Sequence, residues 1–400
     1  MRALLLENLH PEATRILTEA GFEVRTVSSA MDPDELSAAL HGVHVLGIRS
    51  KTEVTAEVLD RAEDLLVVGA FCIGTNQIDS AAAAANGIAV FNAPFSNTRS
   101  VVELAIAEII VMARRLTEKD RALHDGVWDK SAKGSHEIRG RRLGIVGYGN
   151  IGSQLSVVAE ALGMQVYFYD TADKLALGNA RRCASLDELL QTAEAVTLHV
   201  DGRAGNAGMF GREQFRLMRP RSLFLNLSRG FVVDYSALRE CLLDGHIAGA
   251  AVDVFPDEPK AQGDPFVSEL RGLANVILTP HIGGSTQEAQ EDIGRFVATK
   301  VRDYVQSGNT TLSVNLPGLD LPARPGGVQR LVHVHRNVPG VLADIDRILA
   351  DHQINIEGQL LETRGEIGYV VCDLGTPISE PALAELRAMA TAISVRVLDR

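Results

Sequence analysis

The chain has 400 residues, enough for roughly two or three domains, and its 46 % hydrophobic and 22 % charged residues are typical of a soluble globular protein. The formal net charge of −12 argues against nucleic acid or an anionic membrane as a partner, and it means that an anionic substrate would need a local basic pocket. The N-terminal apolar run is too short for a signal peptide, and charged residues interrupt the longest apolar stretch, so no membrane span is expected. The scattered cysteines predict no metal site, and together these features predict a cytoplasmic protein.

The first 97 residues predict an α/β domain, because apolar runs alternate with helical patterns. Strands are expected at residues 3–6, 23–27, 43–48, 66–70 and 88–91. Helices are expected at residues 11–20 and in the alanine run 81–85, which an Asn-Gly pair would end. A long helix from Thr98 to about Leu116 follows this region.

The next segment has a pattern that can hold a dinucleotide. Residues 142–146 form an apolar strand that leads into Gly147, Gly149 and Gly152, in the spacing G-x-G-x-x-G, and a helical pattern follows. The first glycine permits the turn, the second lets a pyrophosphate approach, and the third lets the helix pack on the strand. The pyrophosphate would lie at the helix N-terminus. Asp170 ends the following strand and would bind the ribose, so we predict NAD as cofactor; a turn with only a structural role is the alternative.

The alternation of strands and helices continues to residue 284, as in a doubly wound parallel sheet of the Rossmann type. Strands are expected at residues 195–199, 222–227, 249–254 and 275–279. A helix from 285 to about 307 could return to the first domain, which would then be discontinuous.

The C-terminal part predicts a separate small domain. Residues 316–327 are rich in proline and glycine and indicate a linker. The order that follows is strand, helix, strand, strand, helix, strand, with a tight turn at Arg364 and Gly365. This βαββαβ order is typical of a ferredoxin-like fold.

Three polar residues follow predicted strands of the central sheet: Arg229, Glu258 and His281. Ligands bind outside the carboxyl ends of parallel strands, so these side chains would face one crevice. A guanidinium binds a carboxylate, an imidazole can exchange a proton with an alcohol or ketone, and a carboxylate fixes the imidazole tautomer. This trio suits 2-hydroxy acid oxidation. Surface ion pairs and ordinary loop residues are the alternative reading.

Four segments of this sheet, 142–152, 226–234, 249–259 and 279–285, resemble the D-2-hydroxyacid dehydrogenases, as do residues 71–76 and 91–99. The resemblance covers nearly the whole chain and is greatest to the branch that oxidises D-3-phosphoglycerate and ends in an ACT regulatory domain. It implies a flavodoxin-like substrate domain from 1–97 and 285–318, an NAD-binding Rossmann domain at 98–284, a linker at 319–327 and an ACT domain at 328–400. It also implies that Arg229 orients the substrate and that His281, paired with Glu258, is the acid/base.

The resemblance further implies which residues contact the two ligands of the core. For NAD they are the glycine motif and Asp170 with Asn150, Ile151, His199, Val200, Ser228, Arg229, Asp253, His281, Gly283 and Gly284. For the substrate they are Arg49, Lys51, Gly74, Asn97, Lys130 and Arg229. Arg49, Lys51 and Lys130 would bind the substrate phosphate, and each could instead be an ordinary surface cation. The family pattern often has arginine where Lys51 stands, which keeps the charge but loses the planar fork.

The ACT-like unit implies regulation. His335, Asn337 and Asn355 match positions that bind L-serine between two such domains in relatives, although an asparagine in a turn is more often a capping residue. Pairing of exposed edge strands, together with a contact between cofactor domains, would give a homotetramer.

Two other functions stay open at this point. Another 2-hydroxy acid, such as glycerate, hydroxypyruvate or D-2-hydroxyglutarate, could use the same trio. A non-catalytic NAD-sensing protein could share the fold, but the sequence has no feature that marks a partner surface for it.

Overall fold

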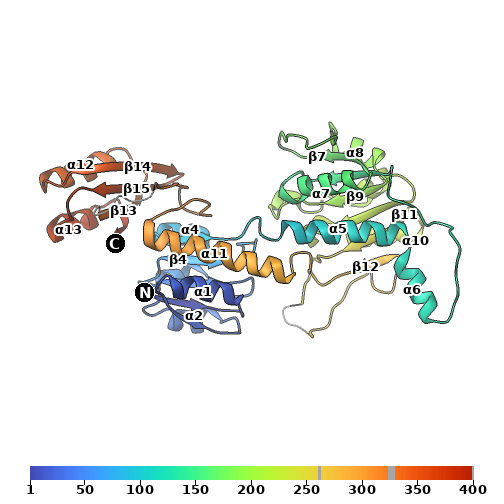
Figure 1. Cartoon of the computed structure of the whole chain (residues 1–400), viewed down its shortest axis with the longest axis horizontal. Helices are drawn as coiled ribbons and strands as arrows, with labels where there is room; N and C mark the ends of the chain where they lie inside the picture. The colour runs from blue at the N-terminus through green and yellow to red at the C-terminus, as the bar shows by residue number, and fades with distance from the viewer. Residues whose placement is uncertain (260–262, 323–328, 399–400) are drawn as a thin grey trace. The chain divides into compact units, whose positions relative to one another are not determined.

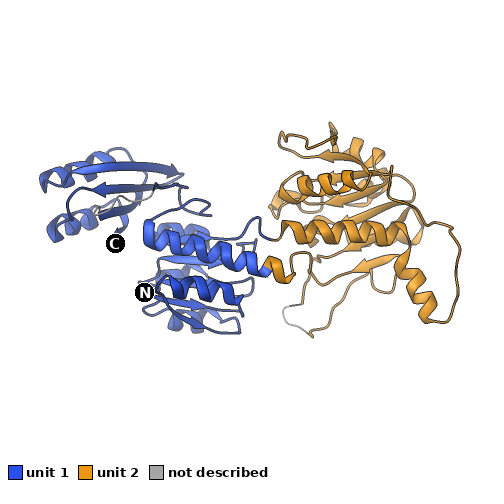
Figure 2. Ribbon diagram, in the orientation of Figure 1, with its two compact units in different colours: residues 1–96, 290–400 blue, residues 97–289 orange. Residues whose placement is uncertain are grey.

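The computed structural model describes residues 1–259, 263–322 and 329–398. The chain forms two compact units, coloured separately in Figure 2. Unit 1 combines Met1–Ser96 with Gln290–Arg400, and unit 2 is Asn97–Ala289. The elements are labelled in Figure 1.

Unit 1 contains a five-stranded parallel sheet in the order β2-β1-β3-β4-β5. Its strands are β1 (Arg2–Leu5), β2 (Glu23–Thr26), β3 (Val45–Ile48), β4 (Val67–Ala70) and β5 (Ala89–Phe91). Its helices are α1 (Pro11–Glu19), α2 (Pro33–Ala39), α3 (Ala56–Asp60), α4 (Ser80–Ala85) and α11 (Gln287–Ser307). Ala3 and Leu5 pack into one core, and Leu4 and Leu6 into another, so both faces of the sheet are covered. The strand order is that of the predicted flavodoxin-like fold.

Unit 2 contains a seven-stranded parallel sheet in the order β12-β11-β10-β9-β6-β7-β8. The strands are β6 (Arg142–Val146), β7 (Gln165–Tyr169), β8 (Arg181–Arg182), β9 (Ala195–Leu198), β10 (Ser222–Asn226), β11 (Ile247–Val252) and β12 (Val276–Leu278). The main helices are α5 (Thr98–Ala113), α7 (Asn150–Ala161), α8 (Leu186–Thr192), α9 (Arg212–Leu217) and α10 (Tyr235–Leu243). With β6 as the first strand, this is the Rossmann order with one strand added, as predicted.

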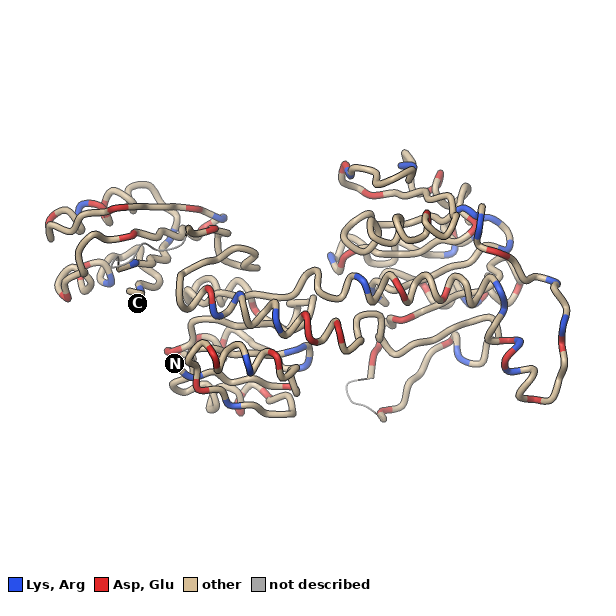
Figure 3. The backbone as a smooth tube through the Cα atoms, viewed as in Figure 1, with Lys and Arg blue, Asp and Glu red and all other residues tan. Residues whose placement is uncertain are grey.

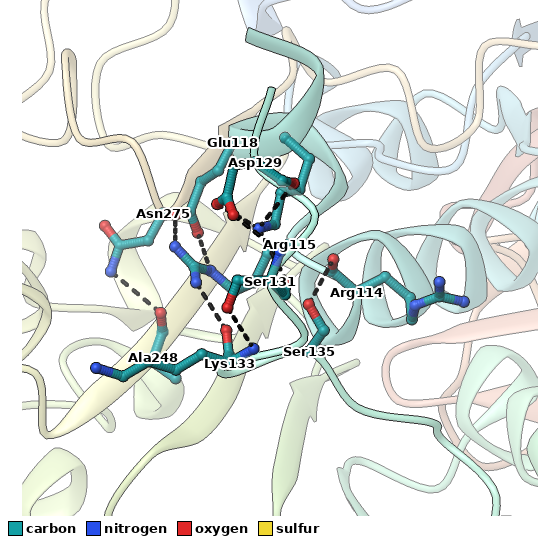
Figure 4. Close-up of polar contacts among 10 residues, drawn as sticks. Arg114, Arg115, Glu118, Asp129, Ser131, Lys133, Ser135, Ala248 and Asn275 are labelled. Carbon is teal, nitrogen blue, oxygen red and sulfur yellow. Dashed lines mark hydrogen bonds and ion pairs between the residues drawn. The ribbon is translucent and has the colours of Figure 1, made fainter. Parts of the chain in front are cut away.

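The helix predicted to run to about Leu116 ends earlier, at Ala113. Arg115 takes a left-handed backbone with φ 53°, which breaks the helix and starts α6 (Leu116–His124). The segment after α6 is held by polar contacts (Figure 4): Arg115 pairs with Glu118 and donates to the carbonyl of Lys133 at 2.9 Å. Lys119 pairs with Asp129. The prediction of one long helix is therefore wrong at this end.

The C-terminal sheet is antiparallel, in the order β14-β15-β13-β16. The elements are β13 (Gln329–Arg336), α12 (Val341–Asp351), β14 (Ile356–Arg364), β15 (Ile367–Leu374), α13 (Glu380–Ala388) and β16 (Ala392–Leu398). Gly365, with φ 59°, forms the tight turn between β14 and β15. This confirms the ferredoxin-like βαββαβ prediction.

This sheet is packed against the rest of unit 1. Leu316 and Leu319 are buried in the same core as Val332, Tyr369 and residues of α11, so the described part of the expected linker is not free. Residues 323–328 lie outside the described residues. Arg330, 1 % exposed, pairs with Asp373 at 2.6 Å and donates to the carbonyl of Ser307 at 3.1 Å. A buried, fully paired arginine ties the sheet to the end of α11.

Charges of both signs are spread along both units rather than gathered in one block (Figure 3). Among the residues that the structure describes, no helix is long and apolar enough to cross a membrane.

Candidate active site

The three polar residues predicted for catalysis all lie in unit 2, just beyond neighbouring strands. Arg229 follows β10, Glu258 lies in the loop after β11, and His281 follows β12. These strands are adjacent and parallel, so their carboxyl ends share one edge of the sheet.

His281 and Glu258 form a hydrogen-bonded pair, with 2.8 Å between His281 Nδ1 and Glu258 Oε2. The other carboxylate oxygen accepts from the N–H of Phe255 at 3.1 Å. The hydrogen bond from Glu258, together with its charge, raises the pKa of His281 despite partial burial. Burial alone would raise the pKa of Glu258, but bonds from His281 and Phe255 and nearby positive charges lower it overall. The pair thus holds a proton on the imidazole next to a carboxylate.

The turn that carries His281 is strained and clamped. His281 has φ 55°, a left-handed conformation that is costly for a residue with a Cβ. The carboxylate of Asp253, 1 % exposed, accepts from Thr279 Oγ1 at 2.6 Å and from the N–H groups of Ile282 and Gly283, both at 2.8 Å. Three bonds to one buried carboxylate therefore fix the direction of the imidazole. This contact to the turn was not part of the role predicted for Asp253.

Arg229 is placed by a polar network that sequence reasoning missed. Asn226 Nδ2 donates to the carbonyl of Arg229 at 3.0 Å and also contacts the hydroxyl of Tyr235, which donates to the Val254 carbonyl at 2.7 Å. The Arg229 charge contributes to lowering the pKa of both Glu258 and His281, so the guanidinium lies near the pair. Asn226 belongs to a segment already singled out in the sequence. It is the last residue of β10, three residues before Arg229, and this position is the signal that could have identified it.

The glycine motif has the geometry that NAD requires. Gly147 has φ 91°, and a Cβ there would meet the carbonyl oxygen of His199, while a Cβ on Gly152 would collide with Gly147. Gly149 begins α7 with open space around it, and no side chain caps the helix. The N–H groups at the start of α7, including those of Asn150 and Ile151, can therefore receive a pyrophosphate.

Asp170 follows β7 and joins this turn. Its Oδ2 accepts from the N–H of Tyr148 at 2.8 Å, and its Oδ1 accepts from the N–H of Ala172 at 2.8 Å. A carboxylate has roughly four lone-pair sites, so acceptor capacity remains for a ribose. Asp170 thus has two tasks, holding the glycine turn and offering a negative charge at its edge.

We expect Asp170→Ala to weaken NAD binding and to narrow the preference for NAD over NADP. Hydrogen bonds to a charged group contribute roughly 1.5–3 kcal/mol, so affinity should fall by about tenfold to a hundredfold. Fluorescence titration with both cofactors measures the ratio. Asp173→Ala, which removes a nearby exposed carboxylate, is the matched control and should leave the ratio unchanged. A preference of the unmodified protein for NADP would contradict the assignment.

The other predicted cofactor residues lie at the same edge of unit 2. They are His199 and Val200 after β9, Ser228 after β10, and Gly283 and Gly284 after β12. Burial lowers the pKa of His199 to about 3, so this imidazole is neutral, and it bonds to Thr197 Oγ1 at 2.9 Å. Asn97, predicted to contact substrate, packs its side chain against Gly284.

The remaining predicted substrate residues are divided between the units. Arg49 and Gly74 lie in unit 1 beyond β3 and β4, and Lys51 is next to Arg49. The amide of Gln77, which sequence reasoning missed, donates to the carbonyls of Arg49 at 2.5 Å and Gly74 at 3.4 Å and so brings these two loops together. Lys130 belongs to unit 2, where it lines a cavity of about 500 Å³ after α6.

The residues predicted to bind serine do not meet within one copy of the chain. His335, 2 % exposed, and Asn337 lie at the end of β13, where the Asn337 amide donates to the carbonyl of Gly365 at 3.0 Å. Asn355 precedes β14, and its carbonyl accepts from Gly375 beyond the far end of β15. The register places these two groups a strand length apart, roughly 25 Å at ~3.4 Å per residue. A small ligand could touch both groups only between two copies.

Comparison with known proteins agrees with this geometry. Residues 106–283 match the NAD-binding domain of the D-isomer-specific 2-hydroxyacid dehydrogenases, and residues 331–394 match an ACT domain like that of the AHAS small subunit. D-3-phosphoglycerate dehydrogenase of Haemophilus influenzae is 47 % identical over 399 residues, which cover 100 % of this chain and 97 % of the relative. The enzyme of the same name from Escherichia coli is 47 % identical over 401 residues, with the same coverage.

A solved structure of a protein from Thermus thermophilus is 30 % identical, with a TM-score of 0.71, and covers 78 % of this chain and 100 % of its own. The full-length similarity and the NAD-binding domain together identify the family. The chain belongs to the D-isomer-specific 2-hydroxyacid dehydrogenases, and within them to the D-3-phosphoglycerate dehydrogenases.

Proposed function

We propose that this chain catalyses the NAD-dependent oxidation of D-3-phosphoglycerate to 3-phosphohydroxypyruvate, the first step of L-serine biosynthesis. The observation that carries the proposal is the His281–Glu258 pair, which lies beside Arg229 at the carboxyl edge of an NAD-binding sheet. The full-length relatives named for this activity support the choice of substrate.

In this proposal His281 takes the proton from the C2 hydroxyl group, and Glu258 keeps Nδ1 protonated so that Nε2 faces the substrate. Arg229 binds the substrate carboxylate and polarises the oxygen on C2. NAD, whose binding the glycine motif and the uncapped α7 accommodate, supplies the acceptor for hydride. Arg49, Lys51 and Lys130 bind the phosphate, and Gly74 and Asn97 shape the substrate loops.

We also propose the division of labour along the chain. Residues 1–97 and 285–318 bind the substrate, 98–284 bind NAD, 319–327 are the linker, and 328–400 regulate. L-serine binds between two C-terminal domains at His335, Asn337 and Asn355, and a second contact between cofactor domains completes a homotetramer in the cytoplasm. Coupling of the C-terminal domain to α11 is supported by Arg330, which pairs with Asp373 and donates to the carbonyl of Ser307 at the end of α11.

The substrate assignment is tested by NADH formation from D-3-phosphoglycerate, D-glycerate and D-2-hydroxyglutarate. We expect the phosphorylated acid to have the highest kcat/KM. A higher kcat/KM for an acid without phosphate would move the assignment to another 2-hydroxy acid, and no turnover with any acid would favour an NAD-sensing protein.

A further inference from the structure

Glu7 lies just beyond β1, and its carboxylate is bound by the loop that follows the neighbouring strand β3. Four consecutive backbone N–H groups donate to it, those of Arg49 and Ser50 at 3.2 Å, Lys51 at 3.0 Å and Thr52 at 2.9 Å. Glu7 is 8 % exposed. Successive N–H groups that converge in this way form a concavity for an anion, and here the protein's own carboxylate fills it.

The backbone is strained where it aims this carboxylate. Glu7 has φ 63° and Asn8 has φ 52°, two left-handed residues in a row that are not glycine. Such residues persist only where the surroundings hold them. The N–H groups of Glu7 and Asn8 bond to the carbonyls of Ser29 at 3.2 Å and Val27 at 3.4 Å. The strained backbone therefore directs the Glu7 side chain toward the loop at residues 49–52.

The same loop is held from its other side. The carbonyl of Arg49 accepts from Gln77 Nε2 at 2.5 Å and from Cys72 Sγ at 3.4 Å, and both groups also reach the carbonyl of Gly74. The loops after β1, β3 and β4 thus form one network. It lies where the strand order reverses between β1 and β3, the place where ligands bind in flavodoxin-like sheets.

The network leaves cations but no loop N–H groups for a ligand. Arg49 is half-buried and Lys51 is exposed. Within the described residues, neither side chain makes an ion pair or hydrogen bond that would neutralise it. Because Glu7 occupies the N–H groups of residues 49–52, this loop can bind an anion only through its side chains.

We infer that Glu7 is a positioning residue for the substrate phosphate: its carboxylate holds residues 49–52 so that the Arg49 and Lys51 side chains receive the phosphate. This inference rests on the proposed function. Glu7 itself does not touch the substrate in this account, because its oxygens are already engaged by four donors.

Glu7→Gln tests the inference with the least change of shape. The amide keeps the length of the side chain and the backbone strain, but one accepting oxygen becomes an NH₂ group that faces N–H donors. The KM for D-3-phosphoglycerate should rise by about tenfold to a hundredfold, the scale expected when a binding group moves by ~1 Å. The kcat and the KM for NAD should change little. Glu23→Gln, on exposed β2, is the matched control and should behave like the unmodified enzyme.

Glu7→Gly adds a test by chemical rescue. Glycine suits the left-handed backbone, and the variant empties the concavity formed by the loop. Its KM for D-3-phosphoglycerate should be raised and should fall again when acetate is added, while acetate should not improve the unmodified enzyme. A raised KM that does not respond to acetate would overturn the role of a carboxylate in the loop.

Different results would overturn the proposed function and the role of Glu7. Unmodified enzyme that does not oxidise D-3-phosphoglycerate would overturn the proposed function. If the unmodified enzyme oxidises D-3-phosphoglycerate but Glu7→Gln has an unchanged KM for it, only the assignment of Glu7 is overturned. The same holds if Glu7→Gln loses kcat and NAD affinity as much as substrate affinity, because a general loss would indicate a purely structural residue.

Discussion

Replacing His281 by alanine should lower kcat by on the order of 10²–10⁴, the usual contribution of general acid–base catalysis. His281 is the imidazole that Glu258 bonds at 2.8 Å and that the Asp253 clamp directs, and no other histidine is predicted to exchange a proton with the substrate. Steady-state kinetics measures kcat, and a fluorescence titration should show NAD affinity close to that of the unmodified enzyme. A variant with near-normal kcat would remove His281 from the mechanism.

Two controls separate proton transfer from structural damage. His124→Ala changes an exposed histidine on α6 and should leave kcat unchanged. Glu258→Gln should cost less than His281→Ala but should move the pH profile. Because Glu258 raises the pKa of His281, losing the carboxylate lowers it. Oxidation needs neutral His281, so its rate rises with pH through this pKa, and the rising limb should shift to lower pH.

Replacing Asn337 or Asn355 by alanine should abolish inhibition at the L-serine concentrations that inhibit the unmodified enzyme, and it should spare uninhibited turnover. Hydrogen bonds to a charged ligand contribute roughly 1.5–3 kcal/mol, so the serine concentration for half inhibition should rise by about tenfold to a hundredfold. The two asparagines lie at opposite ends of the C-terminal sheet. Equal loss from both therefore indicates a site shared by two copies, whose occupation shifts a conformational equilibrium.

A serine titration of the intact enzyme and both variants tests this prediction. Thermal unfolding checks that the variants remain stable, since Asn337 donates to the turn between β14 and β15. Gln353→Ala, before the start of β14, serves as a neighbouring control. If the intact enzyme ignores serine, or if both variants respond like it, serine does not act at this interface. The dehydrogenase assignment would remain.

The features that could be predicted from the sequence are those whose physical requirement is local. The glycine motif is one, because the turn at Gly147 and the contact of Gly152 with it involve residues close in the chain. Arg229, Glu258 and His281 are another, because each lies in the loop that follows an apolar strand of one parallel sheet. The βαββαβ order of the C-terminal unit follows from the same alternation of patterns.

What the sequence could not show depends on partners far along the chain. Glu7 is an ordinary acidic residue in the sequence, and only the folded structure shows that the loop at residues 49–52 surrounds its carboxylate. In the sequence Glu108 merely interrupts an apolar stretch, yet in the structure it is 3 % exposed. Its burial, and to a lesser extent the charge of Asp253, raise its pKa to about 8. Leu316 and Leu319 sit among prolines and glycines, and only the core of unit 1 explains their burial.

In the proposed reaction, C2 of D-3-phosphoglycerate gives a hydride to NAD while His281 takes the hydroxyl proton. This reaction is tested most directly with D-3-phosphoglycerate that carries deuterium at C2. Mass spectrometry of the reduced cofactor should show one deuterium per NADH formed, with 3-phosphohydroxypyruvate in equal amount, and no such product from the L-isomer. Reduced cofactor without deuterium, or no reduction of NAD by this substrate, would contradict the account.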